Sequence, residues 1–322
     1  MKSLGKAAII CTVILFVFLI PGTILTAIGI KELATNDDFG AAVQQFIDDL
    51  DIEEHQSIHV GGYTNVDETF TVVVDDSVET IKLNRIAGEI VVTEGDTDEL
   101  TVRYVGSYPA NAFDNIGVAY EDVSDSDVSG SDIVNDSPIF DCVFNEDSIE
   151  LALNHGNNGW NITGFNDNVW NGEITVTLPA GYDGTLVIDE AAGEMKLRGL
   201  KLEGLEIIKN AVEIEAEACS IMFFTADAAA ANIEIEGAVG GVALHNCMSN
   251  IEIKSAKPFA EPSVIKNCMG NVEIELPASA KLNPEIDNCL GNMRIADSIR
   301  SDRGVDISIE NCMGNVTVEA DD

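Results

Sequence analysis

Asn267-Cys268-Met269-Gly270-Asn271 is one of four copies of a five-residue motif in the last third of the chain. The other copies are Asn246-Cys247-Met248-Ser249-Asn250, Asn288-Cys289-Leu290-Gly291-Asn292 and Asn311-Cys312-Met313-Gly314-Asn315. Their cysteines are 21, 21 and 23 residues apart, and each copy is followed at once by a short alternating stretch such as Val272-Glu273-Ile274. A fixed period of about 20 residues is typical of stacked repeats. The motif therefore predicts a repeat architecture rather than an active site.

The same period extends upstream of the cysteines. Apolar and polar residues alternate with period two in each repeat, which buries one face of a strand and leaves the other in water. The inward apolar positions of eight successive repeats are Ile174, Met195, Val212, Ile233, Ile251, Val272, Met293 and Val316. These patterns predict an all-β fold, a single-stranded β-solenoid resembling a parallel β-helix, with regular rungs over residues 173–322 and strands about 4.8 Å apart.

A turn is expected at each motif. Gly270, Gly291 and Gly314 sit where a left-handed backbone would be cheapest, and Ser249 departs from this pattern in the first copy. Stacked rungs would place Asn above Asn and Cys above Cys, as a hydrogen-bonded amide ladder beside a column of thiols. The predicted structural ladder comprises Asn246, Cys247, Asn250, Asn267, Cys268, Asn271, Asn288, Cys289, Asn292, Asn311, Cys312 and Asn315.

Four regularly spaced cysteines also suggest zinc or disulfides. A tetrahedral zinc site needs its sulfurs within about 2.3 Å of one ion, whereas one cysteine per rung separates the outermost pair by roughly 14 Å. We therefore expect no metal here. Disulfides between neighbouring rungs stay open as an alternative to buried free thiols, although ladder neighbours point in the same direction rather than toward each other. Cys142 and Cys219 have no periodic partner.

The N-terminal residues predict a membrane anchor. Residues 7–30 contain no charged residue and are long enough to cross a bilayer as a transmembrane helix. Lys2 and Lys6 precede them, so residues 1–6 are expected in the cytoplasm and the rest of this single-pass cell-membrane protein outside. Cleavage of a secretory signal near Ala27-Ile28-Gly29 is the competing interpretation. Residues 31–64 are expected to form a helical stalk, on the spacing of Phe39, Val43, Phe46, Ile47 and Leu50.

The charge of the chain restricts its partners. The sequence has 17 Lys and Arg against 56 Asp and Glu, a formal net charge of −39. Nucleic acid is therefore excluded as a partner on electrostatic grounds. Cations or basic proteins are more favourable partners. The alternative is that the acidic surface is only solvated and binds no partner.

An insertion is expected at about residues 106–172 of the β-domain, which spans residues 65–322. Asp125, Asp127, Ser129 and Asp136 approximate a calcium loop, with a solvated acidic loop as the alternative. Calcium is the one cofactor that the sequence suggests. Trp160 and Trp170 are candidate ligand-contact residues in an Asn- and Gly-rich stretch, and the alternative is that they cap the end of the core.

Three further stretches carry a family resemblance: Ile174-Thr175-Val176-Thr177-Leu178-Pro179-Ala180-Gly181-Tyr182-Asp183-Gly184, Ala192-Gly193-Glu194-Met195 and Leu202-Glu203-Gly204-Leu205-Glu206-Ile207. Residues 65–322 resemble the bacterial putative-adhesin family of domain-of-unknown-function β-strand-repeat proteins. The resemblance implies one N-terminal membrane segment joined to a β-solenoid on a Gram-positive envelope, with no catalytic residues. The chain departs from the family at its Asn-Cys-Met-Gly-Asn turns, where members more often carry Thr/Ser-Ser-Gly-Asp.

These observations favour a non-enzymatic protein. The four histidines, His55, His59, His155 and His245, have no spacing typical of a nucleophile or metal site. We expect a cell-surface adhesin or envelope-associated scaffold whose partners are envelope proteins or surface glycans. The alternatives are a sensory or regulatory ectodomain that acts through a membrane partner in envelope stress, and a β-helical carbohydrate-active enzyme.

Overall fold

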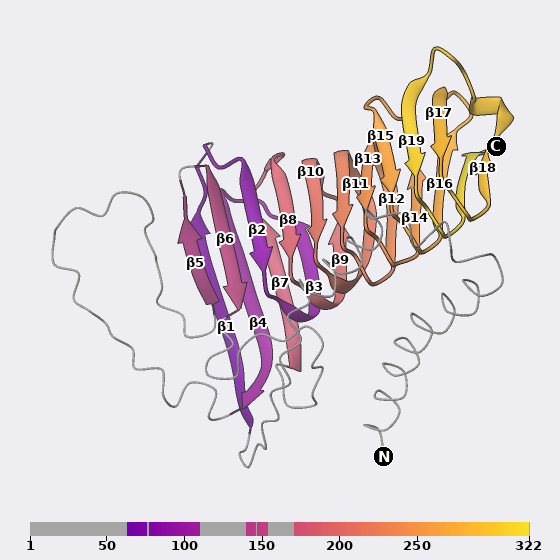
Figure 1. Cartoon of the computed structure of the whole chain (residues 1–322). Coiled ribbons are helices and arrows are strands. Elements are labelled where there is room, and N and C mark those ends of the chain that lie inside the picture. The colour runs from indigo at the N-terminus through magenta and orange to yellow at the C-terminus, as the bar shows by residue number, and fades with distance from the viewer. Residues whose placement is uncertain (1–62, 76, 110–139, 146, 154–170, 322) are drawn as a thin grey trace.

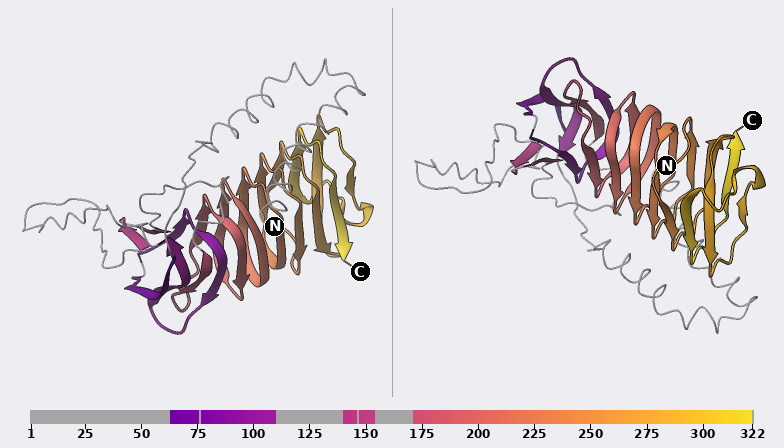
Figure 2. Two further views of the ribbon diagram at one scale, coloured as in Figure 1. Left: turned by 90° about the horizontal axis from the view of Figure 1, so that it is seen from below. Right: turned by 90° about the horizontal axis from the view of Figure 1, so that it is seen from above.

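The computed structural model describes residues 63–75, 77–109, 140–145, 147–153 and 171–321. Within these ranges the chain forms twenty strands and one short 3-10 helix, η3 (Asp297–Ile299). All twenty strands belong to one hydrogen-bonded sheet. They follow one another along a single axis, from β1 and β5 at one end to β17 and β18 at the other (Figures 1 and 2).

Most strands lie in two ladders, and every strand pairing inside either ladder is parallel. Ladder A contains, in spatial order, β7 (Asn171–Leu178), β3 (Ala87–Glu94), β9 (Ala192–Arg198), the first half of β11 (Ala211–Asp227), β12 (Ile233–Val239), β14 (Ile251–Ser255), β16 (Val272–Pro277), β20 (Val316–Asp321) and β18 (Met293–Ile295). Ladder B contains β6 (Ser148–Leu153), β2 (Thr80–Asn84), β8 (Thr185–Asp189), β10 (Lys201–Ile208), the second half of β11, β13 (Val242–His245), β15 (Ser263–Lys266), β19 (Val305–Glu310) and β17 (Leu282–Asp287).

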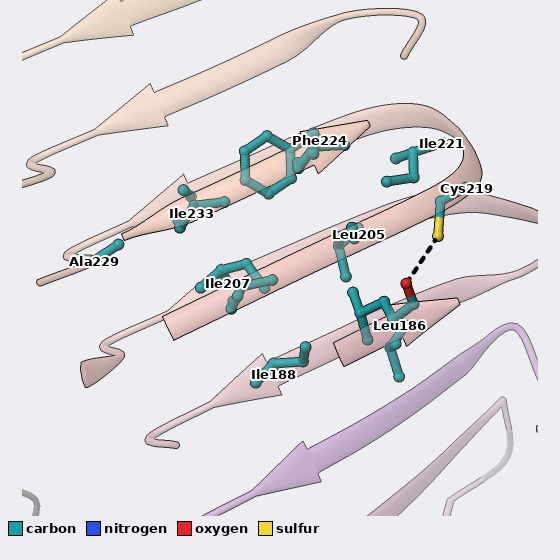
Figure 3. Close-up of a cluster of buried hydrophobic side chains, with 14 of the residues drawn as sticks. Leu186, Ile188, Leu205, Ile207, Cys219, Ile221, Phe224, Ala229 and Ile233 are labelled. Carbon is teal, nitrogen blue, oxygen red and sulfur yellow. Dashed lines mark hydrogen bonds between the residues drawn. The ribbon is translucent and has the colours of Figure 1, made fainter. Parts of the chain in front are cut away.

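The core lies between the two ladders. Alternate residues of each strand point inward, as the burial pattern of β12 and β13 shows. Figure 3 shows Ile233 of ladder A beside Phe224 and Ile207 of ladder B, and all three are buried. Each such side chain contributes about 1.5–3 kcal/mol to folding. Columns of stacked apolar side chains therefore hold the repeats together, and each strand contributes one residue to each column.

Chain order and spatial order differ at both ends of the stack. The last coil, β19 with β20, lies between the coil of β15 and β16 and the coil of β17 and β18. Two backbone hydrogen bonds fix this order: the Met313 N–H donates to the Cys268 carbonyl at 2.9 Å, and the Leu290 N–H donates to the Cys312 carbonyl at 2.9 Å. At the other end, β2 and β3 lie between the coil of β6 and β7 and the coil of β8 and β9.

Each end of the stack is closed differently. Antiparallel strands cover the first end: β4 (Glu99–Pro109) pairs with β7, β1 (Tyr63–Val73) pairs with β4, and β5 (Phe140–Phe144) pairs with β6. At the far end, Pro284 in edge strand β17 has no N–H to offer a further strand. The Ser301 N–H donates to the Leu282 carbonyl at 2.7 Å, and Arg300 Nε donates to the Ile295 carbonyl at 3.1 Å. These hydrogen bonds occupy backbone carbonyls at the edge of the sheet, which disfavours pairing with a further strand.

The predicted single-stranded solenoid with a helical stalk is wrong. Each repeat contributes two strands to the sheet, one to each ladder, and antiparallel strands complete the first end. A period of about 20 residues accommodates two strands of four to seven residues and both corners between them, for example β14 (Ile251–Ser255) with β15 (Ser263–Lys266). Residues 63 and 64, assigned to the stalk, open β1.

The predicted localisation also needs correction. Across residues 63–321, as far as they are described, no helix is both long enough and apolar enough to span a bilayer. The segment expected to do so, residues 7–30, lies outside the described ranges, as do residues 1–6 and 31–62. The single-pass placement therefore has no structural support.

Two details of the predicted repeat also change. The expected insertion, residues 106–172, contains β5 and β6, and β6 pairs with β2 inside the stack. Val212 is not the counterpart of Met195: it pairs with Gly193, while Ile214 pairs with Met195 and Ile233. Val212 is apolar and buried as well, so alternation alone cannot identify the stacked position.

Candidate functional site

The four motifs form one corner of the stack, at the passage from ladder B to ladder A. The first asparagine of each copy has the left-handed backbone, with φ of 54°, 56°, 51° and 53° at Asn246, Asn267, Asn288 and Asn311. The prediction that the glycines hold this conformation is wrong. A Cβ on Gly270 would lie 1.6 Å from the Ser249 carbonyl oxygen, so glycine is required because neighbouring backbones approach closely.

The cysteines follow the left-handed residue and form a column along this corner. The six cysteines within the described ranges are free, and Cys247, Cys268 and Cys312 are fully buried while Cys289 is partly buried. Each thiol donates to the carbonyl two residues earlier and to a carbonyl of a neighbouring coil, as Cys247 does to His245 at 3.2 Å and to Ala226 at 3.5 Å.

Thiol–thiol contact and burial together raise the pKa of Cys268 and Cys312, and burial raises the pKa of Cys289. Cys219, at the opposite corner, hydrogen-bonds in the same way and lies in the core beside Leu205 and Ile221 (Figure 3). Its pKa is also raised by burial. These thiols are therefore protonated at neutral pH, which makes them poor nucleophiles.

The second asparagine of each motif forms a hydrogen-bonded rail on the outer surface. Asn271 Nδ2 donates to Asn250 Oδ1 at 3.2 Å, and Asn315 Nδ2 donates to Asn271 Oδ1 at 3.1 Å. The backbone N–H of Asn292 donates to Asn315 Oδ1 at 3.1 Å. The order of the rail is the spatial order of the coils. The first asparagines are linked less regularly: Asn267 Nδ2 donates to Asn246 Oδ1 at 3.1 Å, but Asn288 Nδ2 donates to Asp287.

Two asparagines outside the motif were missed by the sequence reasoning. Asn232 extends the rail by one coil, because Asn250 Nδ2 donates to its Oδ1 at 3.4 Å. The signal was its position directly before Ile233, as Asn250 stands before Ile251. Asn210 fills the thiol position of an earlier coil and is buried there. Its amide accepts from the Ala191 N–H at 2.7 Å and donates to the Ile188 and Ile208 carbonyls at 2.7 and 2.9 Å.

A column of glutamates runs beside the rail on the same face of ladder A. Glu215, Glu234, Glu252 and Glu273 are in register on four consecutive strands, about 4.8 Å apart. Like charges directly opposite each other on neighbouring strands are unfavourable, so this column costs the fold stability. Lys254 pairs with Glu252 at 2.5 Å, a partial compensation.

The glutamates and the rail together line a shallow groove. Its polar lining residues are Glu194, Glu213, Glu215, Asn232, Glu234, Asn250, Glu252, Asn271 and Glu273. Neither lysine nor arginine is among the described residues that line it. Walls of one sign concentrate counter-charge, so this groove attracts cations. In the described parts of the chain, no group of three or more His, Cys, Asp or Glu is arranged to hold a metal ion.

The remaining candidates lie outside the described residues. Trp160 and Trp170 fall within residues 154–170, and Asp125, Asp127, Ser129 and Asp136 fall within residues 110–139. Their roles as ligand contacts and as a calcium loop stay predictions.

Comparison with known proteins finds only solved structures of low similarity. No family model and no curated protein match the chain. A solved structure described as a putative adhesin from Bacteroides fragilis is similar at 12% identity and a TM-score of 0.48, covering 79% of this chain and 97% of its own. A putative cell adhesion protein from Clostridium sporogenes has 13% identity, a TM-score of 0.33 and coverage of 80% and 100%.

A third similar structure is described as a putative lipid binding protein from Parabacteroides distasonis, with 14% identity, a TM-score of 0.35 and coverage of 78% and 96%. At these identities and TM-scores the three structures carry no argument about function.

Proposed function

We propose that this protein is a non-enzymatic contact protein of the adhesin type, and that it binds a cationic partner along the outer face of ladder A. The observation that carries the proposal is the in-register groove of carboxylates and amides on consecutive coils. A repeated row of identical groups suits recognition of an extended surface better than it suits chemistry at one point.

The rest of the fold supports a passive scaffold. The thiols of Cys247 and Cys268 beside the groove are buried and donate to backbone carbonyls, and the pKa of Cys268 is raised by its thiol neighbour and by burial. The coils are held by columns of buried aliphatic residues such as Ile233, Ile251 and Val272, so the outer face is rigid. A rigid array loses little conformational entropy when it binds, which favours contact through many weak interactions.

Charge selects among the partners expected from sequence. A basic protein surface gains attraction from the glutamates, whereas a neutral glycan would only exchange hydrogen bonds with water. Of the two expected partners, envelope proteins and surface glycans, a basic segment of a protein is therefore the better fit.

The class of partner is tested with the full chain and three soluble polymers of similar length: oligolysine, oligoglutamate and a neutral dextran. We expect binding of oligolysine alone, with an affinity that falls at least tenfold between 50 and 300 mM salt, since exposed charges are screened over about 8–10 Å near physiological salt. Binding of dextran but not of oligolysine would replace the cationic partner with a glycan. Binding of none of the three would contradict the proposal.

A further inference from the structure

The four motif cysteines form one continuous column, in which each sulfur has a neighbouring sulfur on the next coil. The four motif thiols lie on consecutive coils in the spatial order Cys247, Cys268, Cys312 and Cys289, and each donates to a carbonyl of the neighbouring coil. The backbone fixes the same order, because Met269, Met313 and Leu290 donate their N–H groups to the carbonyls of Cys247, Cys268 and Cys312 at 2.8, 2.9 and 2.9 Å. Sulfurs of neighbouring coils therefore stand side by side along the stack axis.

This spacing suits an ion that takes two ligands in a line. Neighbouring parallel strands lie about 4.8 Å apart, and two metal–thiolate bonds of about 2.3 Å laid end to end span about 4.6 Å. Parallel thiols whose side chains leave the axis at a right angle can approach one ion from opposite sides. Soft thiolate ligands favour soft monovalent ions such as Cu(I) over hard ones. A tetrahedral ion cannot use this column because further sulfurs lie beyond the neighbouring pair.

The end of the stack is where such an ion can enter. Cys289 is partly buried in the coil of β17 and β18, which lies at the end of the stack, and the next residue, Leu290, is 54% exposed. The complex would carry one negative charge, which is costly in the interior and tolerable beside solvent. Cys247 and Cys268 are buried in the middle of the column. The pair at the end of the stack, Cys289 with Cys312, is therefore the favoured one.

We propose that Cys289 and Cys312 bind one soft monovalent cation of the Cu(I) or Ag(I) class in linear two-sulfur coordination. Both S–H bonds break, two protons leave to solvent and two metal–sulfur bonds form, with no change of oxidation state. The thiols give up weak hydrogen bonds: Cys289 to the Asp287 and Ile309 carbonyls at 3.2 and 3.5 Å, and Cys312 to the Glu310 and Ile265 carbonyls at 3.4 and 3.6 Å.

The test is a competition for Cu(I) between the full chain and a chromophoric Cu(I) chelator, under anaerobic reducing conditions. Every variant carries Cys11→Ser, so that the thiol outside the described residues does not contribute. We expect one Cu(I) per chain to be withheld from the chelator. Because metal binding displaces protons from the thiols, retention should weaken as the pH is lowered.

Cys289→Ser should weaken this retention at least tenfold, and Cys312→Ala serves as a second variant. Cys247→Ser removes a thiol from the same column at a buried position and should leave retention unchanged, as should Cys142→Ser in β5. Circular dichroism confirms that each variant is folded. Retention that survives Cys289→Ser would overturn the proposal. So would a mass two units lower without bound copper, which means that the pair forms a disulfide instead.

Discussion

Cys312 stacks directly on Cys268, 44 residues earlier in the chain, and separates it from Cys289. The last coil of the protein is therefore an inserted one. Its neighbours on both sides were expected to touch each other, since the motifs at Asn267 and Asn288 are consecutive in sequence. The thiol pair at the stack end depends on this order.

The inserted coil is testable through the asparagine rail. Asn271 and Asn315 share a hydrogen bond of 3.1 Å, whereas Asn271 and Asn292 have Asn315 between them. Double-mutant cycles to alanine, read from the free energy of unfolding, should give a coupling of about 0.5–1.5 kcal/mol for the first pair. The second pair should show none. All three side chains are exposed, so the variants should fold. A coupling confined to Asn271 and Asn292 would mean that the coils stack in chain order.

Gly270→Ala should destabilise the fold by about 1–3 kcal/mol or more, because its Cβ would collide with the Ser249 backbone. Ser249→Ala is the matched control at the same position of the first motif. The Ser249 hydroxyl is buried without a hydrogen-bond partner among the described residues, so its removal should be neutral or slightly stabilising. Chemical denaturation measures both changes. Equal effects of the two substitutions would show that close backbone approach is not the reason for glycine.

Asn210→Ala should destabilise the protein by about 1–3 kcal/mol, because the Ala191 N–H and the Ile188 carbonyl lose a buried partner. Asn232→Ala, at an exposed position of the rail, should cost less than about 1 kcal/mol. The same denaturation measurement compares them. A change at Asn232 as large as that at Asn210 would indicate that the rail, rather than the buried amide, holds the coils.

Stability should fall at alkaline pH. Burial raises the pKa of the Cys142 thiol from 9.0 to about 11. Below pH 9 this thiol is protonated in both the folded and the unfolded state, so its contribution is fully present there. Between pH 9 and 11 the unfolded state loses the proton first, and up to about 3 kcal/mol of stability is lost. The slope of unfolding free energy against pH should be shallower in Cys142→Ala, whatever its stability at pH 7. An unchanged slope would exclude this thiol as a cause.

How far the sequence predicts this fold depends on what repeats in it. Apolar and polar residues alternate around Phe70, Ile81, Ile90 and Leu100, and these segments form β1, β2, β3 and β4. The sequence Ala87-Gly88-Glu89-Ile90 is similar to Ala192-Gly193-Glu194-Met195, and in the sheet these residues pair one to one. Inward and outward residues repeat in every coil, so the positions of the strands can be predicted from the sequence.

The order of the coils was not predictable from the same signal. The motifs beginning at Asn288 and Asn311 are nearly identical, so either could stack on Asn267 with equal local energy. The left-handed residue was misplaced for a similar reason, because asparagine and glycine both tolerate that backbone. The glutamate column of the groove combines residues that look like ordinary solvated positions in each strand, and only the register brings them together.

The most direct test of the proposed function is the affinity of the full chain for oligolysine after loss of the groove charges. Glu215, Glu234 and Glu252 are replaced by glutamine in one variant, and Glu261, Glu285 and Asp302 by their amides in a control that loses equal charge elsewhere on the surface. The proposal predicts that the groove variant binds at least tenfold more weakly by calorimetry, while the control stays within twofold of the parent chain. Equal weakening of both variants would show that net charge, and not the face of ladder A, holds the partner.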